Sequence, residues 1–221
     1  YINAKLNITK YQIPYDYFIS QLNVPTQAKK IIFGLPNKPV TSKLLGRHNQ
    51  LNIQPAVIIG RLLKIPGPKI FSAIKIFPML EHRLELIATK KSIRFYSDTL
   101  ATIPEATIAA IDTLNPTTLI AGGHERKQKY ALLAKKILSS DIRTLILFPS
   151  TGPRLWQEIN SPKIKHFLVN SMSEAVSLAF QHTPPGKICL LSPAAPSFTL
   201  FKDYRDETEQ YKKCIITLKI P

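Results

Sequence analysis

Short apolar strand patterns alternate with helical patterns from residue 84 to residue 216, and this alternation constrains the fold more than any other feature. Two runs with a period of two residues, Leu84–Ala88 and Ile93–Ser97, flank a Thr-Lys-Lys-Ser turn and predict a β-hairpin. The strands predicted beyond the hairpin are Thr118–Ala121, Thr144–Phe148, His166–Val169 and Lys187–Leu191. The helices predicted around them are Pro104–Leu114, Arg126–Leu138, Ser173–Gln181 and Thr199–Ile216, with an irregular piece around Gly152-Pro153. Such alternation predicts an α/β fold with a doubly wound, mostly parallel sheet.

The first 80 residues have a weaker pattern. Two short extended segments and two helices are predicted there, at Lys5–Thr9, Lys30–Phe33, Asn49–Lys64 and Ile70–Ile76. We interpret the extended segments as the end of a sheet whose other strands lie outside this sequence. Because the pattern changes between Pro78 and His82, we predict two domains, residues 1–80 and residues 81–221.

The formal net charge of +16 is concentrated near the start of the chain. Residues 1–80 contain eleven Lys and Arg side chains and a single acid, Asp16. The basic residues are scattered, with neither a Lys/Arg block nor interleaved aromatic residues, so a nucleic-acid partner is not expected. An anionic substrate accounts better for part of this charge. The five histidines have no metal-ligand spacing among themselves or with cysteine, so no metal site is predicted.

Cysteine usage and hydropathy indicate a reducing, cytoplasmic setting. Cys189 and Cys214 each lie within an apolar pattern, so we expect small core residues and neither a disulfide nor a reactive thiol. No apolar run is long enough to cross a membrane, and the first residues do not resemble a signal peptide. Because the chain begins with Tyr1, we expect it to be a fragment or a processed piece.

Four loops that follow predicted strands are candidates for ligand binding. They comprise Ser97–Thr102, Ala121–Arg126, Phe148–Pro153 and Ser192–Ser197. In an open α/β sheet these carboxyl ends share one edge, where ligands gather. From the residues alone, Asp98 and Thr102 could equally cap the helix that Pro104 begins. Ser197 could likewise cap the last helix, whose free N–H groups would suit an anion.

Three ordered motifs, together with a short glycine turn, carry a resemblance to a known family. The sequence G-R-H-N-Q-L-N at residues 46–52 resembles a G-x-H-N-x-x-N helix start. H-R-L-E at residues 82–85, followed by S-D-T-L-A-T-I-P-E-A-T at residues 97–107, resembles H-R-x-E and N-D-S-K-A-T-N-P-x-A-T. The stretch from Ser192 to Tyr204 resembles S-P-A-x-A-S-x-D-x-F-K-x-[FY], and residues 122–126 resemble G-G-x-D-[KR]. These are motifs of the Mur ligases, in particular of their D-glutamate-adding branch.

The resemblance implies a Rossmann-like C-terminal Mur ligase domain at residues 81–221, preceded by the tail of an α/β ATPase domain at residues 1–80. It implies that D-glutamate would be bound by Thr102, Arg126, Ser197, Phe198 and Tyr204. It further implies that ATP would be contacted by Asn49, Asn52, Arg83 and Asp98. No catalytic residue and no metal ligand is assigned within this chain.

The resemblance also implies an activity for the parent protein. That activity is an ATP-dependent addition of D-glutamate to UDP-N-acetylmuramoyl-L-alanine through an acyl phosphate, a step of peptidoglycan precursor synthesis in the cytoplasm. A phosphate loop of the form G-x-x-x-x-G-K-[ST] does not occur here, and the ligands for Mg²⁺ are expected upstream. We therefore expect a monomeric fragment that neither turns over ATP alone nor enters a membrane.

Several residues depart from the family pattern and keep other functions open. Leu100 and Ile103 replace the motif's Lys and Asn, and Glu207-Thr208 replaces an Arg-Gly pair. Pro196 and Thr199 also differ from the expected residues. One alternative is a non-catalytic Mur-like domain that binds a partner or a nucleotide. Another is a related amide ligase for a different amino acid, and a basic nucleic-acid-binding module is the most distant.

Overall fold

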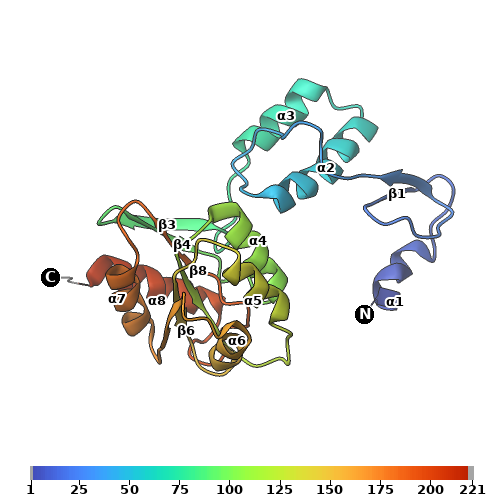
Figure 1. The fold of residues 1–221 in the computed structure, drawn as a ribbon. Coiled ribbons are helices and arrows are strands. Elements are labelled where there is room, and N and C mark those ends of the chain that lie inside the picture. Colours follow the sequence, from blue (N-terminus) through green and yellow to red (C-terminus); the bar gives the residue numbers. More distant parts are fainter. Residues whose placement is uncertain (1, 219–221) are drawn as a thin grey trace. The chain divides into compact units, whose positions relative to one another are not determined.

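A computed structural model describes residues 2–218. The chain divides into two compact units, Tyr1–Pro78 and Met79–Pro221, which we describe separately (Figure 1). Among the helices of the described residues, none combines the length and the apolar character that a membrane span requires.

The second unit is built around a six-stranded sheet with the order β3-β4-β8-β5-β6-β7. Its strands are β3 (Glu85–Lys90), β4 (Ile93–Ser97), β5 (Thr118–Ala121), β6 (Thr144–Leu147), β7 (Lys165–Leu168) and β8 (Ile188–Leu191). Strands β3 and β4 form an antiparallel hairpin, and every other neighbouring pair is parallel. The α/β class, the hairpin and the mostly parallel sheet predicted from the sequence are thus confirmed.

Helices cover both faces of this sheet. They are α4 (Pro104–Leu114), α5 (Ala131–Leu138), α6 (Thr151–Ile159), α7 (Met172–His182) and α8 (Tyr204–Thr217). Figure 1 shows α7 and α8 on one side of the strands and α4, α5 and α6 on the other. The strands β5, β6 and β8 are buried at every position, because both of their faces pack against helices. On the α7 and α8 side, Phe95, Phe180 and Tyr211 lie in the same core cluster.

Three helix boundaries in this unit differ from the prediction. The segment expected to be irregular near Gly152-Pro153 is helix α6, in which Pro153 lies in the first turn, where its missing N–H is tolerated. Helix α5 begins at Ala131 and not at Arg126, because side-chain contacts hold residues 124–130 in a loop. Helix α8 begins at Tyr204 and not near Ser197, since the Asp203 carboxylate caps it by accepting from two backbone N–H groups.

The first unit contains fewer elements. They are α1 (Ile2–Leu6), the 3₁₀ turn η1 (Asn7–Thr9), β1 (Tyr17–Ser20), β2 (Lys29–Ile32), α2 (Arg47–Leu62) and α3 (Gly67–Ile76). Strands β1 and β2 form a parallel pair, and Ile53, Val57 and Ile70 form a small core between α2 and α3. The prediction of an extended segment at Lys5–Thr9 is wrong. Those residues are helical, and the Thr9 hydroxyl donates to the Leu6 carbonyl as in a local turn.

Candidate functional site

The loops that follow β4, β5, β6 and β8 meet at the carboxyl edge of the sheet. The backbone N–H of Gly122 donates to the Pro193 carbonyl at 2.8 Å, and that of His124 donates to the Pro196 carbonyl at 2.7 Å. The hydroxyl of Thr151, the first residue of α6 after strand β6, accepts from the Gly123 N–H at 2.9 Å. These bonds tie the β5 loop (residues 122–130) to the β8 loop (residues 192–203) and to the start of α6.

Two glycines make this close approach sterically feasible. Gly122 has a φ of 106°, and a Cβ there would lie 2.6 Å from the Phe148 carbonyl oxygen. At Gly123, a Cβ would lie 2.5 Å from the Pro196 carbonyl oxygen. Because both contacts are with backbone, a side chain at either position would push the neighbouring loop away.

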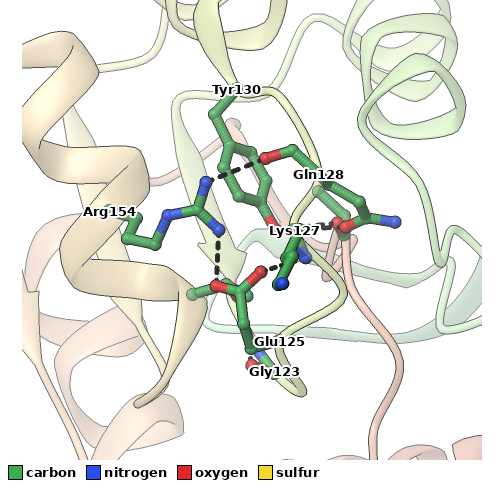
Figure 2. A network of polar contacts seen from close by, with 8 residues as sticks. Gly123, Glu125, Lys127, Gln128, Tyr130 and Arg154 are labelled. Carbon is green, nitrogen blue, oxygen red and sulfur yellow. Dashed lines mark hydrogen bonds and ion pairs between the residues drawn. The ribbon is translucent and has the colours of Figure 1, made fainter.

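A polar network then fixes the rest of the β5 loop (Figure 2). The Gln128 side-chain amide donates to the Thr102 carbonyl at 2.7 Å, and the Tyr130 hydroxyl lies 3.2 Å from Gln128 Oε1 and 3.3 Å from the Ala194 carbonyl. Arg154 reaches from α6 to form an ion pair with Glu125, and it donates to the Gln128 carbonyl at 3.0 Å. The charged partner lowers the pKa of the Glu125 carboxyl. The network thereby joins three of the four loops.

Asp98 lies beneath this edge and not on its surface. It is 4% exposed, and its carboxylate accepts from the Ser192 hydroxyl at 3.0 Å and from the Leu84 N–H at 3.4 Å. Burial raises the pKa of Asp98 to about 6, against the opposing effects of Ser192, Leu84 and the exposed Arg83. The Ser192 hydroxyl also contacts the Thr107 hydroxyl at 2.9 Å, so this network joins the β4 and β8 loops from below.

Ser197 lies in the β8 loop and is 5% exposed. The expectation that it opens the last helix is wrong, because α8 begins seven residues later. Its hydroxyl donates to Glu207 Oε2 at short range, so it is directed into the protein. Glu207 is completely buried, and within residues 2–218 its other oxygen, Oε1, has no hydrogen-bond partner. Burial raises the pKa of Glu207 to about 8, although the hydrogen bond from Ser197 opposes this shift.

The other residues predicted to bind D-glutamate lie near the surface. Arg126 is exposed and Thr102 is half-buried. Phe198 is 58% exposed and packs edge-on against His124. Tyr204 makes a similar edge contact with His82 at a centroid distance of 5.2 Å. Within residues 2–218, no hydrogen bond or ion pair directly joins the side chains of Thr102, Arg126 and Ser197; their loops are joined through Gln128 and His124.

Two of the residues predicted to contact ATP lie in the first unit. Asn49 and Asn52 occupy the first turns of α2. The Asn49 amide donates to the Leu45 carbonyl at 2.7 Å, and the Asn52 amide donates to Asn49 Oδ1 at 3.2 Å. Both side chains therefore have local hydrogen-bond partners at the start of α2, although neither caps the helix.

Cysteines and acidic residues give no metal centre in the part of the chain that is described. Among residues 2–218, no group of three or more His, Cys, Asp or Glu side chains could hold a metal ion. Cys189 is a buried core thiol, as expected, and burial raises its pKa to about 12.

Sequence reasoning did not identify Gln128, Tyr130, Arg154 or Glu207 as parts of the site. The residues from Thr151 to Ile159 have a strongly amphipathic pattern that could have indicated α6, and with it Arg154. Glu207 could have been found from its spacing, since it precedes the buried Tyr211 and Ile215 by four and eight residues on the core face of α8.

Comparisons with known proteins agree with this fold. A family profile described as "Mur ligase, glutamate ligase domain" matches residues 82–195. The UDP-N-acetylmuramoylalanine–D-glutamate ligase of Lachnoclostridium phytofermentans is 33% identical over 179 residues, which are 80% of this chain and 39% of that protein. The ligase of the same name from Desulfotalea psychrophila is 34% identical over 178 residues, with the same coverage of both chains. The chain thus spans about two fifths of the length of these relatives.

Solved structures support the fold. MurF from Acinetobacter baumannii superimposes with a TM-score of 0.67 at 15% identity, over 88% of this chain and 52% of that one. A pseudomurein peptide ligase type C from Methanothermus fervidus gives a TM-score of 0.61 at 16% identity, over 81% and 38%. Because the family profile covers more than half of the chain, the protein belongs to the Mur ligase family and contains its C-terminal glutamate ligase domain.

Proposed function

We propose that this chain is the C-terminal part of an ATP-dependent ligase that adds D-glutamate to UDP-N-acetylmuramoyl-L-alanine. The observation that carries the proposal is the 33% identity over 179 residues to a ligase with this named activity. That alignment is longer than the second unit, which has 143 residues from 79 to 221, so it extends into the first unit. The likeness therefore covers the segment that would end the ATPase domain as well as the amino-acid-binding domain.

The proposed reaction has two steps. ATP transfers its terminal phosphoryl group to the carboxylate of the UDP-sugar substrate, which gives an acyl phosphate and ADP. The amine of D-glutamate then attacks the acyl carbon, the C–O bond to phosphate breaks, and an amide and inorganic phosphate are released. The second unit would hold the amino acid at the carboxyl edge of its sheet, which lowers the entropic barrier of the attack.

We propose a role for each candidate residue. The exposed guanidinium of Arg126 could form a bidentate pair with a carboxylate of D-glutamate. Thr102 and Ser197 would contribute polar contacts, and the rings of Phe198 and Tyr204 would border the amino acid. For the nucleotide, we propose contacts from Asn49, Asn52, Arg83 and Asp98. ATP binding with Mg²⁺ would require the phosphate loop and acidic ligands of the upstream region, so we assign no step to Mg²⁺ in this chain.

Isothermal titration of the 221-residue chain with D-glutamate tests the proposal, with L-glutamate as the stereochemical control. We expect selective binding of D-glutamate, and we expect Arg126→Ala to weaken it by about 10- to 100-fold, the effect of removing a charged hydrogen bond. Lys127→Ala removes a neighbouring exposed cation and should leave the affinity nearly unchanged. Equal losses in the two variants would contradict a specific role for Arg126.

A non-catalytic Mur-like binding domain remains the second candidate, because Leu100, Ile103 and Glu207 depart from the family motif. Absence of binding to every acidic amino acid would favour this candidate. Binding of a different amino acid would indicate a related amide ligase. Salt-dependent binding to unrelated DNA would support a nucleic-acid-binding module instead.

A further inference from the structure

The carboxyl group of Glu207 lies on the core face of helix α8. Tyr211 and Ile215, one and two turns further along the same face, are completely buried, as Glu207 is. Its oxygen Oε2 contacts the Ser197 hydroxyl, and within the described residues its oxygen Oε1 has no hydrogen-bond partner. Burying a negative charge with an unpartnered oxygen is far more costly than burying a neutral acid, so the geometry favours the protonated form.

We propose that Glu207 is a positioning residue whose proton is donated to Ser197 Oγ, which frees the Ser197 hydroxyl hydrogen to bind a ligand carboxylate. This inference rests on the proposed function, in which Ser197 belongs to the D-glutamate site. A hydroxyl group has a single hydrogen to donate. If Glu207 is ionised, Ser197 must donate that hydrogen to it and can offer only lone pairs to a ligand, which would repel a carboxylate.

Within residues 2–218, no cationic side chain forms a hydrogen bond or an ion pair with Glu207. His82, which packs against Tyr204 at the start of α8, contacts the Thr208 hydroxyl at 3.0 Å and not Glu207. Asp206 is the one charged side chain that shifts its pKa, and it shifts it upward, in the same direction as burial does. Helix α8 packs against α7 and β3. Charged groups of those elements have other partners: Lys90 donates to the Ile215 and Ile216 carbonyls, Glu85 accepts from the His82 N–H, Glu174 accepts from the Asn170 N–H, and His182 stacks on Phe167.

Ser197 is also close to the surface on which the ligand is expected. The preceding residue, Pro196, accepts from the His124 N–H of the β5 loop, and the following residue, Phe198, is 58% exposed. The loop therefore emerges at the carboxyl edge next to Ser197. The proposed change requires rotation of one hydrogen only, without displacement of either side chain.

The test uses the full chain and the variant Glu207→Gln, whose amide imitates the protonated acid and can always donate to Ser197. The dissociation constant for D-glutamate is measured by calorimetry from pH 6.5 to pH 9.5. In the wild type we expect the affinity to fall by about tenfold for each pH unit above the pKa of Glu207, because each binding event must take up one proton. In Glu207→Gln this loss should be absent, and any change left in the variant reports titration of the ligand itself. Identical pH profiles for the two proteins would overturn the inference and leave the proposed function intact.

A second measurement decides the inference if D-glutamate does not bind at any pH, an outcome that contradicts the proposed function. The ¹³C chemical shift of the Glu207 carboxyl carbon is followed against pH in the full chain, with Glu207→Gln used to assign the signal. A midpoint near 8 is expected, and it should rise in Ser197→Ala, because the Ser197 hydrogen bond lowers the pKa of Glu207. A midpoint below about 5, the ordinary range of a glutamate, would overturn the inference.

Discussion

The β5 loop and the β8 loop follow neighbouring strands of one sheet, yet they are ordered in opposite ways. The β8 loop is buried from Ser192 to Ser197, and hydroxyl groups and backbone contacts hold it. After its two glycines, the β5 loop is largely exposed, and charged or amide side chains such as Glu125 and Gln128 hold it. The contrast indicates that one side of the candidate site is part of the core, whereas the other side is held at the surface by side-chain contacts.

The stability of the protein should be most sensitive to substitutions at the contact between the β5 loop and the β8 loop. Gly123→Ala would place a methyl group against the Pro196 carbonyl, and we expect a loss of about 4 kcal/mol in the free energy of unfolding, from overpacking and backbone strain together. Urea denaturation measures this loss. Gly34→Ala is the matched control, since a Cβ there meets nothing within 4 Å. Equal stability of the two variants would show that the loops separate without cost.

The buried carboxyl of Asp98 should make stability depend on pH. Its pKa is raised from 3.8 to about 6 in the folded state, so the neutral form is favoured by folding. The stabilisation is fully present below pH 4 and is lost as the pH rises through 6, a difference of about 3 kcal/mol. Asp98→Asn should not show this loss. The quantity to compare is the wild-type minus variant difference in unfolding free energy at pH 4.5 and pH 7.5, which should change by about 2 kcal/mol because part of the stabilisation is already lost at pH 4.5. A constant difference would contradict the assignment.

Removal of the Ser192 hydroxyl tests the buried side of the site and should cost less stability than the two preceding changes. Ser192→Ala removes the donor to Asp98 and the contact with Thr107, and we expect a loss of about 2 kcal/mol, because polar groups are left unpaired in the interior. Thermal and urea unfolding at pH 7 measure it. Ser173→Ala, at an exposed serine in the first turn of α7, is the control and should change stability by about 0.5 kcal/mol or less. A Ser192→Ala variant as stable as this control would mean that the hydroxyl network contributes nothing.

Removal of Arg154 should have the smallest global effect, because its ion pair with Glu125 is exposed to solvent. We expect Arg154→Ala to leave the unfolding midpoint nearly unchanged but to speed amide hydrogen exchange in residues 124–130. Arg143→Ala, at another exposed position, should leave exchange in the β5 loop as it is. If exchange in the β5 loop stays slow without Arg154, the glycine contacts alone order this loop.

Local patterns were sufficient to predict most of the fold. The bounds of α4 and β5 match the prediction, because their periodicity and the opening proline are local signals. The starts of α5 and α8 could not be predicted in the same way. Each depends on side chains that bind a distant loop or cap a later turn, as Gln128 and Asp203 do.

The position of the candidate site could be predicted from the sequence, but the contacts between its side chains could not. Topology alone brings four strand ends to one edge, and three of the four loops had been singled out by their motifs. The pairing of Glu125 with Arg154 depends on a helix that was predicted to be irregular. The pairing of Ser197 with Glu207 depends on where α8 begins, and a one-turn shift of that start would remove it.

The place of β8 between β4 and β5 has a consequence for biosynthesis of the protein. Arg94 of β4 pairs with Ile188 of β8, so the 93 residues between the two partners must be synthesised before they can pair. Until the ribosome has released residues 188–191, the nascent sheet exists as two separate pieces with open strand edges, a hairpin and a three-stranded ribbon. We therefore expect chains truncated before residue 188 to aggregate or to need chaperones, whatever the intrinsic stability of their helices.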